Sequence, residues 1–280
     1  MERPPAGRER AVAVGLVLIA AASPQVGAAF AVTLFDELGP AGTAFLRLAF
    51  AAVVLWAIWR PRLTGDLRLA GAFGVALGLM NWSFYEAIDR IPLGVAVTIE
   101  FAGPLLVAVI GSRRLLDGVW IALAAAGIVL LVNPGGGSVD PIGVGFALVA
   151  GGCWMAYIYL SKRTGAAFAG GSGLALAMAV GALIVLPAGA IGARAALAEP
   201  DLLVAALVVA LVSSVLPYSL ELVALRRLPE AVYGVLVSLD PAVAALAGFA
   251  VLHQDLVARD VVGIAMVIVA SAGAAGLSHR

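Results

Sequence analysis

The sequence predicts an all-α integral membrane protein with ten transmembrane helices, arranged as two inverted five-helix repeats with both termini in the cytoplasm. Three observations lead to this fold class: an apolar composition, ten long apolar segments, and two similar segments 137 residues apart. Hydrophobic residues make up 63% of the 280 residues and charged residues 12%, and the mean hydropathy is +1.08. Because a soluble chain has about 25% charged residues, this composition cannot cover a water-facing surface.

Ten segments are each long and apolar enough to cross a bilayer, whose core needs roughly 20 helical residues. They are 11–35, 40–59, 67–87, 91–111, 117–133, 141–161, 171–192, 202–225, 229–250 and 257–277. Short connections rich in Pro, Gly or Asp separate them, such as DELGP, DRIP, NPGGGSVDP and RRLPE. The charged N-terminal stretch before the first segment is typical of a signal peptide, but the length of that segment and the nine that follow favour a membrane helix.

The distribution of basic residues predicts the orientation, because cytoplasmic loops carry an excess of Arg and Lys. With the N-terminus inside, thirteen of the seventeen basic residues lie in inner segments, three lie in outer loops, and Arg47 lies within a span. The inner residues are Arg3, Arg8, Arg10, Arg60, Arg62, Arg68, Arg113, Arg114, Lys162, Arg163, Arg226, Arg227 and Arg280, and the outer ones are Arg90, Arg194 and Arg259. Both termini are therefore expected in the cytoplasm.

Two proline pairs indicate an internal repeat. Pro92 and Pro104 are twelve residues apart, as are Pro229 and Pro241, and one offset of 137 residues superposes the two pairs. The repeat divides the chain near its glycine-rich loop into two halves of five predicted helices each. Since five is odd, the second half must enter the membrane in the opposite direction. Inverted repeats are typical of alternating-access carriers, whose sites lie near the bilayer midplane between the halves.

This division gives the predicted domain organisation. Residues 1–10 form a cytoplasmic tail, 11–135 the first five-helix repeat, and 136–280 the second.

Glu100 is the first candidate for a functional site. A carboxylate in hydrocarbon is rarely kept unless it pairs, titrates or binds something. About 13 Å separate Glu100 from the outer membrane edge at a helical rise of 1.5 Å per residue. Pro104, four residues on, has no N–H, so the carbonyl of Glu100 loses its helical donor. We expect Glu100 to bind a cationic amino group or a proton, since burial favours the neutral form of a carboxyl group. The alternative is a permanent ion pair with Arg47 that locks two helices.

Three further charged residues at membrane depth each allow two interpretations. Arg47 is suited to hold a substrate carboxylate with its planar fork, or to extend toward the interface. Glu221 is either an inner gate or an interfacial ion-pair partner of the nearby arginines. Asp240, which precedes Pro241, either binds a ligand or caps a broken helix. Glu86 lies near the outer mouth and is expected at the interface.

Several other polar, aromatic and proline residues are predicted to surround the same mid-depth layer. The polar and aromatic members are Gln25, Asn81, Trp82, Tyr85, Trp154, Tyr157, Tyr218 and Ser219. Pro24, Pro104, Pro217 and Pro241 are predicted to break helices there, and Pro217 frees the carbonyl of Ser213. For any single aromatic residue, core packing is the alternative.

The sequence also excludes several classes of function. Its one cysteine, Cys153, excludes a disulfide framework and a Cys-rich metal site, and its two histidines, near the ends of spans, argue against a histidine-based metal site. No phosphate-binding loop of the G-x-x-x-x-G-K-[ST] type occurs, and no nucleophile–base pair stands out, so we expect no enzyme, no cofactor and no nucleic acid. The expected partners are a small-molecule substrate, protons and the lipid bilayer, and the sequence does not predict an oligomeric state.

Three stretches carry a resemblance to a known family: FLRLAF around Arg47, IPLGVAVTIEFAGPLLVAVIGSRR at 91–114, and LPYSLELVALRRLPE at 216–230. With the paired prolines, they resemble the EamA-type carriers of the drug/metabolite transporter superfamily, and among these the bacterial exporters of threonine and homoserine. The resemblance covers nearly the whole chain. It implies a multi-pass protein of the bacterial inner membrane that exports small amino acids by proton antiport with alternating access.

The resemblance also implies roles for Arg47, Glu100, Pro104, Tyr218 and Glu221. Two positions depart from the family pattern: an aspartate stands at 240 where a glutamate is expected, and a Ser-Pro-Gln run occupies 23–25. The nearest alternative is an EamA-type exporter of another metabolite or of a drug-like cation. A membrane receptor, an assembly scaffold and an intramembrane enzyme are the alternatives from other classes.

Overall fold

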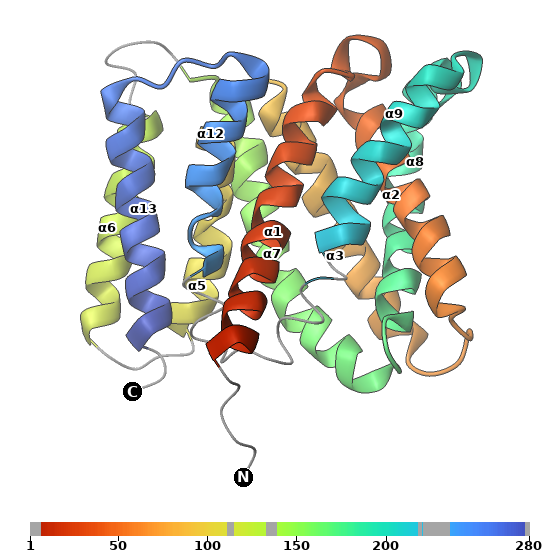
Figure 1. The fold of residues 1–280 in the computed structure, drawn as a ribbon, viewed down its shortest axis with the longest axis horizontal. Coiled ribbons are helices and arrows are strands. Elements are labelled where there is room, and N and C mark those ends of the chain that lie inside the picture. The colour runs from red at the N-terminus through yellow and green to blue at the C-terminus, as the bar shows by residue number, and fades with distance from the viewer. Residues whose placement is uncertain (1–6, 111–114, 133–138, 218–219, 221–235, 278–280) are drawn as a thin grey trace.

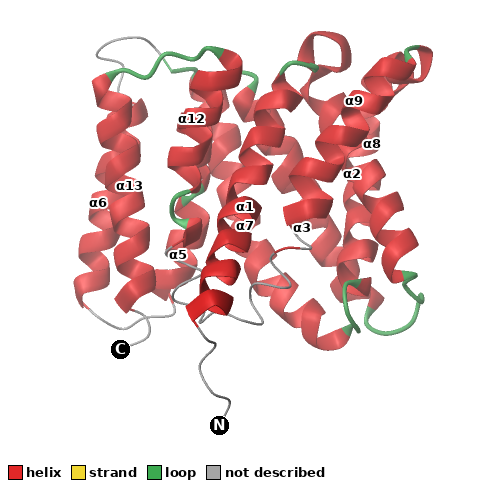
Figure 2. Ribbon diagram, viewed as in Figure 1, coloured by secondary structure: helices red, strands yellow, loops and turns green. Residues whose placement is uncertain are grey.

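The computed structural model describes residues 7–110, 115–132, 139–217, 220 and 236–277. This part of the chain contains helices and connections but no strand (Figure 2). The helices are α1 (Gly7–Val32), α2 (Phe35–Trp59), α3 (Leu67–Ile88), α4 (Leu93–Glu100), α5 (Ala102–Ile110), α6 (Leu115–Val132), α7 (Pro141–Ala167), α8 (Ser172–Ala198), α9 (Pro200–Ala210), the π-helical turn η1 (Leu211–Val215), α12 (Asp240–Leu252) and α13 (Ala258–Leu277).

Local sequence explains several of the helix ends. Asp66 caps α3 by accepting a hydrogen bond from the Leu69 N–H at 3.0 Å. Asp140 caps α7 in the same way, from the Ile142 N–H at 2.9 Å, and Pro141 occupies the first turn, where its missing N–H has no cost. α2 ends at Trp59, because the next residue, Arg60, has a left-handed φ of 43° that stops the helix.

Three helices are long and apolar enough to cross a membrane by length and composition: α2, α7 and α8. Shorter apolar helices occur at 18–32, 93–107, 118–132, 200–215 and 240–252. The chain is thus an all-helical protein with membrane-type helices. The predicted segments 67–87 and 257–277 coincide with α3 and α13 within one residue at each end.

Two predicted boundaries are wrong. The DELGP stretch, predicted as a connection, lies inside α2, where Gly39 alone leaves the helical conformation, with a φ of 66°. Glycine adopts this left-handed φ at no steric cost, so the chain bends there and continues as helix. The segment 91–111, predicted as one helix, is divided into α4 and α5 at Phe101, close to Pro104.

The helices stand side by side in one bundle (Figure 1). Close pairs form between α2 and α8, α3 and α7, and α6 and α13, while α12 packs against both α1 and α4. The start of α1, the α7–α8 connection and the end of α13 lie at one end of the bundle, called here the terminal end. The α3–α4 and α12–α13 connections lie at the opposite end, called here the distal end.

The break between α4 and α5 is packed directly against α7. A Cβ atom added to Gly151 of α7 would lie 2.7 Å from the backbone carbonyl oxygen of Glu100, and one added to Gly103 would overlap the carbonyl of Gly151. Small residues allow such close approach of helices in a membrane. The contact fixes the position of Glu100 by backbone packing.

Candidate functional site

A cavity of about 680 Å³ lies inside the bundle, within the range of about 300–1,000 Å³ that is usual for small-molecule sites. Most of the residues predicted for the site line it, and those within the named helices come from α1, α2, α3, α4, α5, α7 and α12. The lining includes Gln25, Arg47, Asn81, Glu100, Trp154, Tyr157 and Asp240, together with Pro24, Pro104 and Pro217.

Three predicted site residues, Tyr218, Ser219 and Glu221, fall outside the described residues. Two others are placed by the structure but are not part of the lining. Tyr85 lies behind Arg47 and contacts its guanidinium, and Pro241 occupies the first turn of α12. α1 runs without interruption through Pro24, so this proline removes one backbone hydrogen bond without ending the helix.

The guanidinium of Arg47 is held by three hydrogen bonds inside the bundle. Its Nε donates to Ser214 Oγ at 3.0 Å, Nη1 donates to Tyr85 Oη at 3.2 Å, and Nη2 donates to the carbonyl of Ser213 at 2.9 Å. Its central carbon lies 5.5 Å from the centre of the Tyr85 ring, a favourable cation–π distance. Arg47 is 7% exposed, so it is turned toward the cavity and does not extend to the interface.

Two donors of Arg47 remain for a ligand. A guanidinium has five N–H groups, and the contacts within the described part of the chain use three of them. A carboxylate accepts two parallel hydrogen bonds from such a fork. The fixed guanidinium at the cavity wall is therefore suited to bind a carboxylate.

The carboxylate of Glu100 lines the same cavity and accepts no hydrogen bond within the described residues. The ion pairs closer than 4.0 Å in this part of the chain join Glu86 and Asp89 to Arg90, and Arg259 to Asp260. The permanent ion pair between Glu100 and Arg47, one of the two alternatives from the sequence, is not formed in this structure. A buried carboxyl group and a buried guanidinium thus line one cavity.

Amide and aromatic side chains complete the wall. Asn81 donates to the Leu77 carbonyl at 2.8 Å, which leaves its side-chain oxygen as an acceptor beside the cavity. Trp154 packs edge-on against Phe101 at 5.4 Å between ring centres, and Tyr157 packs against Phe73 at 5.2 Å. These two aromatic pairs give the cavity an apolar part of its wall, in addition to the part formed by charged side chains.

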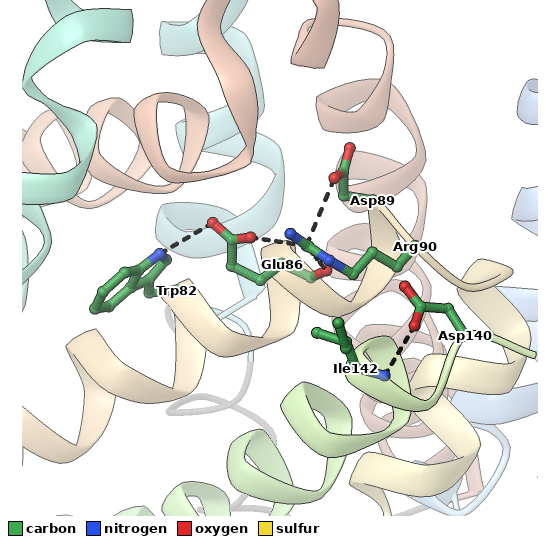
Figure 3. A network of polar contacts seen from close by, with 6 residues as sticks. All are labelled: Trp82, Glu86, Asp89, Arg90, Asp140 and Ile142. Carbon is green, nitrogen blue, oxygen red and sulfur yellow. Dashed lines mark hydrogen bonds and ion pairs between the residues drawn. The ribbon is translucent and has the colours of Figure 1, made fainter.

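Glu86 belongs to a separate polar network at the distal end (Figure 3). It accepts from Trp82 Nε1 at 3.2 Å and pairs with Arg90 at 2.8 Å, and Arg90 also lies 3.6 Å from Asp89. Neither Trp82 nor Glu86 lines the cavity. The prediction that Trp82 shapes the pocket is therefore wrong, because its indole N–H is directed to Glu86.

The cavity extends to the terminal end and stops short of the distal end. Lys162, Gly165, Gly170 and Gly171, at or beside the α7–α8 connection, are part of its lining. No described residue of the α3–α4 or α12–α13 connections lines it. At the distal end, the side-chain oxygen of Gln254 accepts a hydrogen bond from the first N–H of α4, at Leu93, at 3.0 Å, which ties the two halves of the chain together.

Sequence reasoning missed several cavity residues, including Phe84, Ser161, Lys162, Thr164 and Ser271, and of Ser213 it indicated only the carbonyl. The hydroxyls of Thr164, Ser213 and Ser271 are buried without a hydrogen-bond partner within the described residues. Pro217 indicated that the Ser213 carbonyl lacks its helical donor, and Arg47 donates a hydrogen bond to that carbonyl. No pattern in the sequence distinguishes the Ser213 hydroxyl from other small polar groups in apolar helices. Among the described residues, no group of three His, Cys, Asp or Glu side chains is placed to hold a metal ion.

Comparison with known proteins identifies relatives over most of the chain. The family model of the EamA-like transporter family matches residues 141–275. The threonine/homoserine exporter RhtA of Escherichia coli (strain K12) is 42% identical over 264 residues, which cover 92% of this chain and 89% of the exporter. The protein of the same name from Salmonella typhimurium (strain LT2) is 41% identical over the same shares. The similarity includes the first half of the chain as well as the second.

Proposed function

Because the chain belongs to the EamA-like transporter family, we propose that it is a secondary carrier that exports small amino acids such as threonine and homoserine across a bacterial inner membrane. The observation that carries this proposal is the cavity that presents the carboxylate of Glu100 and the guanidinium of Arg47 together. An amino acid is a zwitterion, with one charged group for each. The similarity to exporters named for these two amino acids supports the choice of substrate.

The two charged residues have separate roles in this proposal. Arg47 binds the substrate carboxylate with its two remaining N–H groups. Glu100 binds the substrate ammonium, and in the absence of substrate it binds a proton. Since one carboxylate cannot hold both at full strength, binding of a proton and binding of the amino acid exclude each other at Glu100. This competition couples export of the amino acid to proton entry.

The same proposal includes a ten-span architecture of two inverted repeats, 11–135 and 136–280, with both termini in the cytoplasm. The excess of basic residues in the predicted inner segments supports the orientation. With that orientation, the terminal end faces the cytoplasm, and the cavity that reaches Lys162 and Gly165 is in the inward-open state. The Gln254–Leu93 contact then closes the outer side, and its opening is one step of alternating access.

Uptake of labelled threonine and homoserine into inside-out membrane vesicles tests this function. A vesicle lumen more acidic than the medium drives protons out as the amino acid moves in, so accumulation should appear with the gradient and collapse when an uncoupler removes it. Vesicles from cells without the protein are the control. Absence of uptake in vesicles that contain folded, abundant protein contradicts the choice of substrate.

A second candidate function is export of a drug-like or aromatic cation. The specific observation in its favour is the group of aromatic side chains in the cavity wall, which includes Phe84, Phe101, Trp154 and Tyr157, since aromatic faces attract cations. Competition distinguishes the two candidates. A zwitterion carrier prefers threonine to a permanently charged aromatic cation, whereas a cation carrier has the opposite preference.

A further inference from the structure

The π-helical turn η1 leaves two backbone carbonyls without their usual helical donors. The Leu216 N–H donates to the carbonyl of Leu211, five residues back, so the carbonyl of Val212 loses the donor that it would have in an α-helix. The carbonyl of Ser213 loses its donor because Pro217 has no N–H. Single π-helical turns are rare and frequently occur at functional sites.

Both carbonyls accept hydrogen bonds from side chains of the first half of the chain. Ser23 Oγ of α1 donates to the carbonyl of Val212, and Arg47 Nη2 of α2 donates to the carbonyl of Ser213. Ser214 Oγ accepts from Arg47 Nε. The turn therefore fixes the guanidinium through one carbonyl and one hydroxyl of adjacent residues.

The hydroxyl of Ser213 remains without a partner within the described residues. Ser213 is 2% exposed and lines the cavity, next to the residue that holds the Nε of Arg47. Gly27 of α1 leaves room for this hydroxyl, because a Cβ atom at Gly27 would overlap Ser213 Oγ. A buried hydroxyl is normally hydrogen-bonded, so an unpartnered hydroxyl on a cavity-lining residue whose own carbonyl accepts from Arg47 fits a ligand oxygen.

We propose that η1 forms the carboxylate subsite of the carrier, in which Ser213 Oγ binds the substrate carboxylate together with Arg47, and Ser214 is a positioning residue for Arg47. This inference rests on the proposed function and deepens it. The subsite offers three donors: the two remaining N–H groups of Arg47 and the O–H of Ser213. It selects ligands with a free carboxylate over amides and alcohols of the same size, because these lack the negative charge that the three donors match.

Binding of L-threonine, L-threonine amide and L-threoninol to the purified full-length protein tests the subsite. Wild type and the variants Ser213→Ala, Ser213→Thr and Gly27→Ala are compared. Loss of a hydrogen bond to a charged group weakens binding by roughly 10- to 100-fold. We expect this loss for threonine in Ser213→Ala, with little change for the amide and the alcohol, and recovery in Ser213→Thr, which keeps the hydroxyl. Gly27→Ala should reproduce the selective loss by displacing the hydroxyl without removing it.

Ser214→Ala tests the positioning role through the same comparison. Because Ser214 acts on the carboxylate through Arg47, the ratio of threonine to threonine-amide affinity should fall, and Ser214→Thr should restore it. A change in packing alone would weaken both ligands equally and leave this ratio unchanged, which would contradict the role.

The outcomes separate this inference from the proposed function. Threonine binding that is unchanged in Ser213→Ala, or that weakens equally for threonine and its amide, overturns the subsite while the carrier function stands. Wild-type protein that binds other carboxylates, such as aliphatic or aromatic amino acids, but neither threonine nor homoserine overturns the choice of substrate. In that case the subsite is upheld if Ser213→Ala weakens those carboxylates selectively. Wild-type protein that binds no carboxylate at all overturns both.

Discussion

Glu100 and Arg47 line the same cavity without forming an ion pair, and three of the five N–H groups of Arg47 donate to Tyr85, Ser213 and Ser214 instead. The carboxylate at the end of α4 is therefore not neutralised by its nearest buried cation. A ligand that brings its own ammonium and carboxylate satisfies both residues at once.

Glu100→Gln should abolish gradient-driven uptake of threonine in inside-out vesicles, while the protein remains folded in the membrane. The amide is nearly isosteric but binds no proton and carries no negative charge for the ammonium. Glu86→Gln is the matched control, since Glu86 lies in the network of Trp82 and Arg90 outside the cavity. It should leave uptake close to that of wild type, because Glu86 is not part of the cavity lining. Full, gradient-dependent uptake by Glu100→Gln would rule out the proposed coupling role.

Tyr85→Phe should weaken threonine binding by roughly 3- to 10-fold, because it removes one of the hydrogen bonds that hold the guanidinium of Arg47 in place and keeps the ring beneath it. Titration calorimetry of the purified protein measures this change. Tyr159→Phe on α7 is the control, since Tyr159 is 47% exposed and outside the cavity lining. Equal effects of the two substitutions would contradict a special role for the Tyr85 hydroxyl.

Gly151→Ala should lower the stability of the protein by about 1–3 kcal/mol, the usual cost of overpacking, and should also reduce transport. Its new methyl group would lie 2.7 Å from the Glu100 carbonyl, so the backbone that holds the carboxylate must move. Gly152→Ala is a close control, because a Cβ atom there meets nothing within 4 Å. Thermal unfolding of both variants in the same detergent compares them, and equal melting temperatures would contradict the packing argument.

Single-cysteine variants should react with a membrane-impermeant thiol reagent from opposite sides of the membrane. On a Cys153→Ser background, Val257→Cys at the distal end should react in intact spheroplasts. Gly165→Cys at the terminal end should react only in inside-out vesicles. Val257 is 53% exposed and Gly165 has open space around it, so neither substitution perturbs packing. Labelling of Gly165→Cys from outside would reverse the proposed orientation.

Local signals in the sequence predicted the helices and much of the cavity. Apolar length predicted α3 and α13 almost to the residue, and rare charges in apolar segments identified Arg47 and Glu100, which line one cavity. Pro217 predicted a free carbonyl at Ser213, and Arg47 donates to that carbonyl. These features depend on composition and on neighbours within a few residues, which the sequence states directly.

Long-range contacts could not be predicted in this way. The partners of Arg47 lie 38 to 167 positions away along the chain, so no spacing rule indicates that they would occupy its donors and leave Glu100 unpaired. The π-helical form of η1 depends on side chains of α1 and α2 that donate hydrogen bonds to its freed carbonyls. The continuation of α2 through DELGP depends on a single left-handed residue, Gly39, and a Gly-Pro pair ordinarily indicates a turn.

The direct packing of Gly151 on the Glu100 carbonyl also restricts how this carrier can diverge in evolution. No side chain stands between the acidic residue and α7 at that contact, so mutation there can only add bulk and damage the fold. Substitutions that change the substrate can instead occur at positions that line the cavity, such as Phe84, Trp154 and Tyr157. Homologous carriers can thus differ in substrate while the Glu100 carboxylate and the backbone contact that supports it stay unchanged.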